Sequence, residues 1–88
     1  MEKALPATNA ERVLLLLAEK GRKNTAEIAR EMGKTYIYIR NLLYDLKRRD
    51  LVDCEYVRRY VPGITWILMN EWHITDKGVK WLKKKNLL

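Results

Sequence analysis

The apolar positions in the first third of the chain recur at helical spacing. A stripe of apolar residues three and four positions apart runs from Ala10 to Ala18. Thr8 and Glu11 have the spacing of a capping box, in which each side chain bonds the backbone N–H of the other residue. Gly21 is suited to end a helix in a left-handed conformation. The pattern therefore predicts a first helix between Thr8 and Gly21.

The next two apolar stripes predict two helices joined by a very short turn. Asn24 and Glu27 repeat the capping-box spacing, and the stretch TAEIAREMG then allows about two turns of helix before Gly33. Thr35 can cap a third helix over residues 36–49. The apolar stripe of this helix is Ile39, Leu42, Leu43 and Leu46. Two helices joined by a three-residue turn that contains glycine predict a helix-turn-helix.

Beyond residue 50 the chain is rich in β-branched and aromatic residues, which predicts a β-hairpin over residues 52–74. Pro62 and Gly63 fit the central positions of a type II turn. Asn70 and Glu71 interrupt the alternation of the second strand and favour a bulge. The pairs expected from a turn centred on Pro62 and Gly63 are Val61 with Ile64, Arg59 with Trp66, and Val57 with Leu68.

A last helix is predicted after Thr75, which can cap it, with Val79 and Leu82 as apolar positions and Gly78 as a weak point in its first turns. The 88 residues suffice for one small core and are too few for two. We therefore expect a single α+β domain over residues 1–88, a winged helix-turn-helix made of three helices, a hairpin wing and a C-terminal helix.

Positive charge is concentrated in the later part of the chain. The net charge is +7; residues 1–33 carry six cations and five anions, whereas residues 34–88 carry twelve cations and six anions. Such a balance favours an acidic partner such as nucleic acid. The excess positive charge therefore lies in the part of the chain that contains the third helix and the hairpin.

Two segments resemble the winged helix-turn-helix domains of MarR-, PadR- and ArsR-like transcriptional regulators. YIRNLLYDLKRRDLV resembles the end of their recognition helix, although Asp50 stands where glycine is commoner, and WHITDKGVKWL resembles their strand end and final helix. The resemblance covers about residues 8–82. The short chain, rich in Lys, Tyr and Ile, is also similar to regulators of archaea and their viruses.

The resemblance implies that the third helix enters the major groove of double-stranded DNA and that the hairpin wing meets the backbone or minor groove. Arg40 could read guanine and Asn41 adenine. Tyr38 has an alternative role, folding against the wing to extend the core. Only one of two adjacent wing arginines can face DNA, and Arg59 could instead stack on Trp66. The DNA-binding residues expected are Lys34, Thr35, Tyr36, Tyr38, Arg40, Asn41, Tyr44, Lys47, Arg48, Arg58 and Arg59.

The resemblance also implies a homodimer formed through terminal helices. The expected interface residues are Trp81, Leu82, Leu87 and Leu88. The run VLLLLA offers a second candidate dimer interface. Only one face of that helix fills the core, so some of its leucines remain available to a second copy of the chain.

Catalysis finds no support in the sequence, because His73 and Cys54 are single and serine is absent. We expect no metal, no cofactor, no small-molecule effector and no membrane segment, and a cytoplasmic protein, in a host cell if the chain is viral. The main hypothesis is a sequence-specific DNA-binding transcriptional regulator. The alternative is a winged-helix module that binds protein or RNA within a larger assembly, with the tyrosines as its contact surface.

Overall fold

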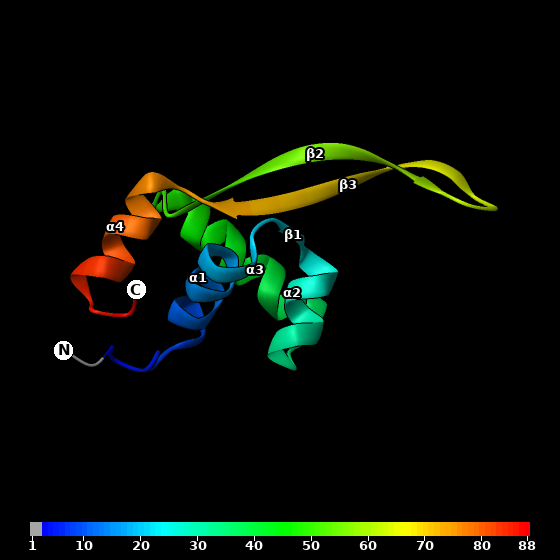
Figure 1. Ribbon diagram of the computed structural model, residues 1–88. Helices are drawn as coiled ribbons and strands as arrows, with labels where there is room; N and C mark the ends of the chain where they lie inside the picture. The colour runs from blue at the N-terminus through cyan, green and yellow to red at the C-terminus, as the bar shows by residue number, and fades with distance from the viewer. Residues whose placement is uncertain (1–2) are drawn as a thin grey trace.

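The computed structural model describes residues 3–88, which form four helices and a three-stranded antiparallel sheet. Figure 1 follows the chain through its elements. They are α1 (Asn9–Lys20), β1 (Lys23–Asn24), α2 (Thr25–Met32), α3 (Tyr36–Arg48), β2 (Val52–Val61), β3 (Thr65–Ile74) and α4 (Asp76–Lys84). The expected α+β class and the order of helices, hairpin and last helix are confirmed.

The helices begin where the capping signals predict. Thr8 and Asn24 each accept a hydrogen bond from a backbone N–H inside their helix, and the carboxylates of Glu11 and Glu27 complete both capping boxes. The Thr35 side chain caps α3 by accepting from the backbone of Tyr38. The Thr35 bond fixes the start of α3 directly after the short turn that follows α2.

The strand β1 was not expected from the sequence. It is only two residues long, and it pairs with β3 through Lys23 opposite Trp72 and Asn24 opposite Glu71. The strand order is therefore β1-β3-β2, with β3 in the centre. A strand this short has no alternation of its own, so its position depends on the central strand.

The expected turn at Pro62 and Gly63 is confirmed, because Ile64 donates a backbone hydrogen bond to the Val61 carbonyl at 3.0 Å and Gly63 has a φ of 84°. The register predicted from it is wrong by one residue. A type II turn does not match the twist of a hairpin, and Thr65, with a φ of 109°, absorbs the mismatch. The observed pairs are Val61 with Thr65, Arg59 with Ile67, and Val57 with Met69.

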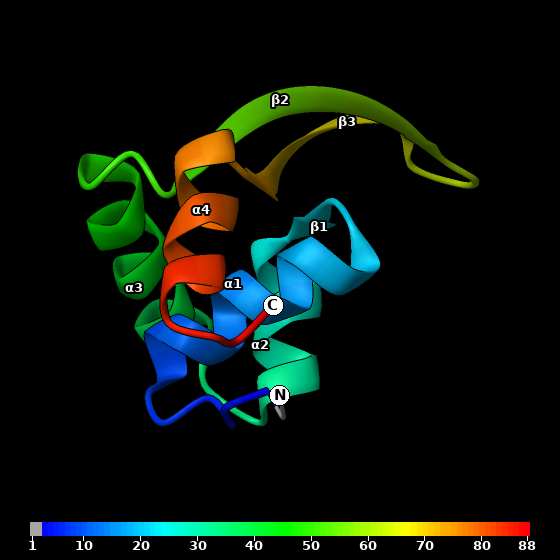
Figure 2. The same ribbon diagram turned by 60° about the vertical axis from the view of Figure 1, so that its left-hand side comes forward.

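The predicted bulge at Asn70 and Glu71 is also wrong, because pairing continues through both residues: Tyr56 lies opposite Asn70 and Glu55 opposite Glu71. The hairpin is thus an uninterrupted ribbon. Figures 1 and 2 show the helices gathered on one side of its base, while its outer half extends beyond them. The molecule measures 50 × 25 × 22 Å as a result.

The core lies between the helices and the base of the hairpin. Trp72, at the centre of the sheet, is the largest fully buried side chain, and its Nε1–H donates to the hydroxyl oxygen of Thr25 at 2.9 Å. This bond ties β3 to the start of α2. The other fully enclosed side chains are Val13, Leu14, Ile28, Ile39, Leu43, Leu46, Leu51, Val52 and Leu82.

The end of α3 is closed by a Schellman motif. Asp50 donates its backbone N–H to the Lys47 carbonyl at 2.9 Å, and Leu51 donates to the Leu46 carbonyl at 3.1 Å. Asp50 has a φ of 60°, the conformation that favours glycine and that aspartate tolerates. The motif turns Leu51 back into the core beside Leu46.

Gly78 marks the closest approach of α4 to the segment after α3. A Cβ at this position would lie 2.3 Å from the carbonyl oxygen of Leu51 and 2.6 Å from Cγ1 of Ile74. We expect Gly78→Ala to lower the free energy of unfolding by about 1–3 kcal/mol, although alanine favours a helix by about 1 kcal/mol. Urea denaturation followed by circular dichroism measures this, and Lys80→Ala on the exposed side of α4 is the control. An alanine variant as stable as the parent would contradict the close packing.

Candidate nucleic-acid interface

The helix α3 divides into an inward and an outward face. Ile39, Leu43 and Leu46 are buried, whereas Arg40 and Asn41 are exposed. Within residues 3–88, neither Arg40 nor Asn41 makes a side-chain hydrogen bond or an ion pair. Their polar groups are therefore free to bond the edges of bases or another polar partner.

The three tyrosines of α3 have three different environments. The hydroxyl oxygen of Tyr38 accepts a hydrogen bond from Nδ2 of Asn9 at 2.9 Å, so this ring contacts the start of α1. Tyr44 meets the Trp72 ring edge to face, with centroids 5.4 Å apart. Tyr36 lines a hollow of about 300 Å³ between the start of α2 and residues 67–70 of the wing. All three rings remain at least 40% exposed.

The turn before α3 places two further expected residues at the surface. Lys34 and Thr35 line a shallow hollow with Asn9, Gly33 and Tyr38. Both are exposed, and the backbone N–H groups of the first turn of α3 lie beside them. Positive charge and free N–H groups at a helix start suit a phosphate group.

The cations at the end of α3 have partners of their own. Lys47 donates to the thiol sulfur of Cys54 at 3.6 Å, and Arg48 pairs with Asp45 at 3.1 Å. Both side chains are exposed, and both lie in the last turn of the helix, where positive charge offsets the helix dipole. The arrangement of Lys47 and Arg48 fits stabilisation of the helix end as well as contact with a phosphate group.

The two wing arginines point to opposite faces of the ribbon. Cζ of Arg58 lies 5.9 Å from the centroid of the Trp66 ring. Arg59 instead bonds the carboxylate of Glu71, which is nearly buried. The alternative of Arg59 stacking on Trp66 is thus wrong, since the one-residue shift in register exchanges the two arginines.

Acidic groups at the base of the wing are matched by arginines. Glu55 lies directly opposite Glu71, an arrangement that would be repulsive by itself. Arg22 bonds Glu55 with nitrogen–oxygen distances of 3.0 and 3.3 Å. The hydrogen bond from Arg22 and its charge lower the pKa of Glu55. Two arginines, both still exposed, thereby pair with the acidic groups at the base of the wing.

The residues expected at a dimer interface fall into two groups. Leu82 and Leu87 are buried in this chain's own core. A Schellman motif explains why: Asn86 has a φ of 60°, and Leu87 donates to the Leu82 carbonyl at 2.9 Å, which folds the chain end back. Trp81 and Leu88 remain partly exposed, and Trp81 carries the ammonium of Lys85 4.5 Å from its ring centroid.

Sequence reasoning missed the residues that hold this surface in place. Trp72, Asn9 and Glu71 position Tyr44, Tyr38 and Arg59 respectively. Trp72 had a usable signal in the sequence, because it directly follows Asn70 and Glu71, which interrupt the alternation of the strand. Asn9 contacts a residue 29 positions away and Glu71 contacts one 12 positions away, so no local sequence pattern predicts either contact.

From residue 3 to 88, no three His, Cys, Asp or Glu side chains are grouped so that they could hold a metal ion. Over the same range, each helix is too short or too polar to cross a membrane.

Comparisons with known proteins match the fold. No family model and no curated protein sequence matches this chain. Among solved structures, ZitR of Lactococcus lactis in complex with DNA has a TM-score of 0.66 at 24% identity and covers 96% of this chain. A transcriptional regulator homologue from Pyrococcus horikoshii OT3 has a TM-score of 0.71 at 17% identity over 86% of this chain and 70% of its own. A MepR mutant from S. aureus has a TM-score of 0.70 at 22% identity over 90% of this chain.

This chain spans about half the length of the ZitR and MepR chains, 53% and 56% respectively. The matched part contains the helix-turn-helix, the hairpin and the last helix, since 96% of this chain is covered. The protein therefore has the winged helix-turn-helix fold that these transcriptional regulators share.

Proposed function

We propose that this protein is a sequence-specific double-stranded DNA-binding transcriptional regulator, with α3 in the major groove and the wing on the backbone or minor groove. The observation that carries the proposal is the outward face of α3, where Arg40 and Asn41 are exposed and unbonded among the described residues. An α-helix fits the major groove, where arginine recognises guanine and asparagine adenine. The solved complex of ZitR with DNA supports the same use of the fold.

Lys34 and Thr35 at the helix start contact phosphate in this arrangement, and the hydroxyls of Tyr36, Tyr38 and Tyr44 reach phosphates or sugars beside it. Such contacts hold the helix in register and carry no sequence preference. Lys47 and Arg48 add positive charge at the other end of α3, where the ion pair with Asp45 partly offsets the charge of Arg48.

A titration of labelled random-sequence duplex DNA, followed by fluorescence anisotropy at two salt concentrations, tests the proposal. We expect micromolar or tighter binding that weakens steeply with salt, because each phosphate contact releases counterions and contributes a slope of about 0.9. No binding at low salt, or binding indifferent to salt, would contradict it. That result would favour the alternative, a protein-binding or RNA-binding module.

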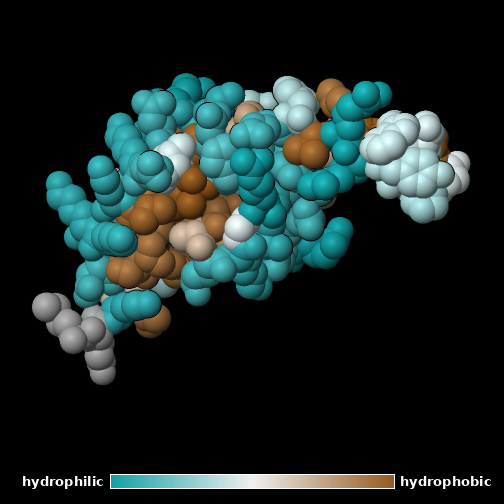
Figure 3. Space-filling model, turned by 45° about the horizontal axis from the view of Figure 1, so that its top comes forward, coloured by the Kyte–Doolittle hydropathy of each residue, from teal (hydrophilic) through white to brown (hydrophobic). Residues whose placement is uncertain are grey.

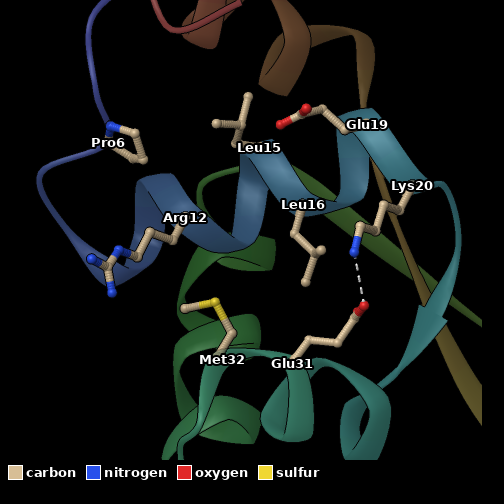
Figure 4. A pocket seen from close by; sticks show the side chains of 8 residues that line it. All are labelled: Pro6, Arg12, Leu15, Leu16, Glu19, Lys20, Glu31 and Met32. Atoms are coloured by element: carbon tan, nitrogen blue, oxygen red, sulfur yellow. Dashed lines mark hydrogen bonds and ion pairs between the residues drawn. The ribbon is translucent and has the colours of Figure 1, made fainter.

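We also propose that the protein acts as a homodimer joined through α1 beside α4. Leu15 and Leu16 are half-buried and point to opposite sides of α1 (Figure 4). Leu16 lies in a hollow of about 330 Å³ with Met32. Leu15 borders that hollow and a second of about 240 Å³, which Leu88 also lines. Figure 3 shows apolar surface near the N-terminal end of the molecule.

Leu15→Arg is expected to convert the dimer to a monomer, since it places a charge on this apolar surface. Sedimentation velocity measures the change, and circular dichroism verifies folding. Ile37→Arg is the matched control, because Ile37 is 63% exposed on α3, away from the proposed contact. Two variants that sediment alike as dimers would argue against α1 as the interface.

A further inference from the structure

The two faces of the outer wing differ in exposure. Cross-strand pairing places Tyr60 opposite Trp66 and Arg58 opposite Leu68, with Tyr56 next on the same face. We call these five residues the aromatic face of the wing. Its four hydrophobic side chains are 58–71% exposed. On the other face, Val57, Val61, Ile67 and Met69 are half-buried, and Arg59 is bonded to Glu71.

The aromatic face continues the surface of α3. Alternation along β3 puts Trp66 and Leu68 on the same side as Trp72, whose ring packs on Tyr44 of α3. Tyr36 of α3 and residues 67–70 of the wing share a hollow. A molecule bound along α3 would therefore meet this face of the wing as well.

The charge and geometry of this face suit an anionic partner with an apolar interior. Arg58 is the one arginine on this face, because Arg59 lies on the other face, and residues 56–70 contain no acidic residue. Arg58 lies over the Trp66 ring, and the ring of Tyr60 meets that ring at a centroid distance of 5.6 Å. In Figure 3 the wing end carries pale side chains of intermediate hydropathy.

The length of the ribbon matches the spacing of DNA grooves. At about 3.3 Å per residue, Leu68 and Trp66 lie roughly 13 and 20 Å beyond Trp72. The major groove and the next minor groove are half a helical turn apart, about 17 Å. With α3 in the major groove, this length is enough for the end of the aromatic face to reach the next minor groove.

We infer that Trp66, supported by Tyr60 and Arg58, is an apolar wedge that enters the minor groove of duplex DNA and bends it. The inference rests on the proposed DNA-binding function and adds a deformation to it. Arg58 meets the negative potential of the groove, while the indole ring contacts sugars and a partly unstacked base step. Wedges of this kind kink DNA by about 20–90°.

The test uses the full chain and a duplex of about 21 base pairs with a fluorophore at each end, so that energy transfer reports bending and anisotropy reports binding. We expect bending with the parent protein and its loss with Trp66→Ala, which should bind roughly tenfold more weakly. Ile67→Ala is the matched control, because Ile67 is the next residue on the opposite face; it should bend DNA as the parent does.

The other outcomes separate the two proposals. Binding of the parent without bending would overturn the wedge and leave the DNA-binding function standing. Equal bending by Trp66→Ala and the parent would also overturn it. No binding of the parent at low salt would overturn the DNA-binding function, and the wedge with it. A change in sedimentation of Trp66→Ala without DNA would show that the aromatic face joins two copies of the chain instead.

Discussion

Replacement of Trp72 by alanine is expected to lower the free energy of unfolding by about 3–5 kcal/mol. Three kinds of contact are lost together, since the indole is fully enclosed, donates to Thr25 at 2.9 Å and meets the ring of Tyr44. Because small domains have only about 5–15 kcal/mol of stability in total, this loss is a large fraction of the whole. Urea denaturation monitored by circular dichroism measures the loss.

Two further variants make this result interpretable. Trp72→Phe keeps an aromatic ring and loses the hydrogen bond to Thr25, so it should fold with a smaller loss of about 1–3 kcal/mol. Trp81→Ala removes a half-buried tryptophan from α4 and should cost less than Trp72→Ala. Equal losses at Trp72 and Trp81 would contradict the central place of Trp72 in the fold.

Arg40→Ala is expected to weaken binding to a selected DNA site by about ten- to a hundredfold, while random-sequence affinity changes much less. The guanidinium of Arg40 is exposed and unbonded within residues 3–88, so its removal leaves the protein's own contacts intact. Selection of a preferred site from random duplexes, followed by anisotropy titrations with both DNAs, measures the difference. Asn41→Ala should lower discrimination at a neighbouring base in the same way.

Lys34→Ala is the matched control for Arg40→Ala. Lys34 is exposed in the turn before α3, and the proposed arrangement assigns it a phosphate contact. Its loss should weaken binding to both DNAs alike and reduce the salt slope by about one. If Arg40→Ala also weakened both DNAs equally, Arg40 would be a phosphate contact and the base-reading role would be lost.

The sequence predicted those parts of the fold that depend on local chemistry. Thr8, Asn24 and Thr35 cap helices through residues three positions away, so their signals are contained within single turns. The positive φ of Asp50 likewise fits the expectation that glycine is commoner at this position. Local hydrogen bonds therefore account for the correct ends of the helices.

The parts that sequence reasoning missed depend on long-range geometry. The register of the wing shifted by one residue because the turn takes in Ile64, and a shift of one exchanges the two faces of a strand. The roles of Arg58 and Arg59 changed with it. The fate of Leu82 and Leu87 was missed for another reason: the chain end folds back through Asn86 and buries them.

The junction between α3 and α4 would determine the spacing of two DNA half-sites bound by two copies of the chain. Thr75 donates its hydroxyl to the Asp50 carbonyl at 2.6 Å and its N–H to the Leu51 carbonyl at 3.1 Å, while Gly78 leaves no room for a side chain against Leu51. The end of α3 and the start of α4 are therefore held together as one rigid unit. In a dimer joined beside α4, such a rigid junction would fix the distance between the two α3 helices. The dimer could then not adjust that distance to one base pair inserted between two DNA half-sites.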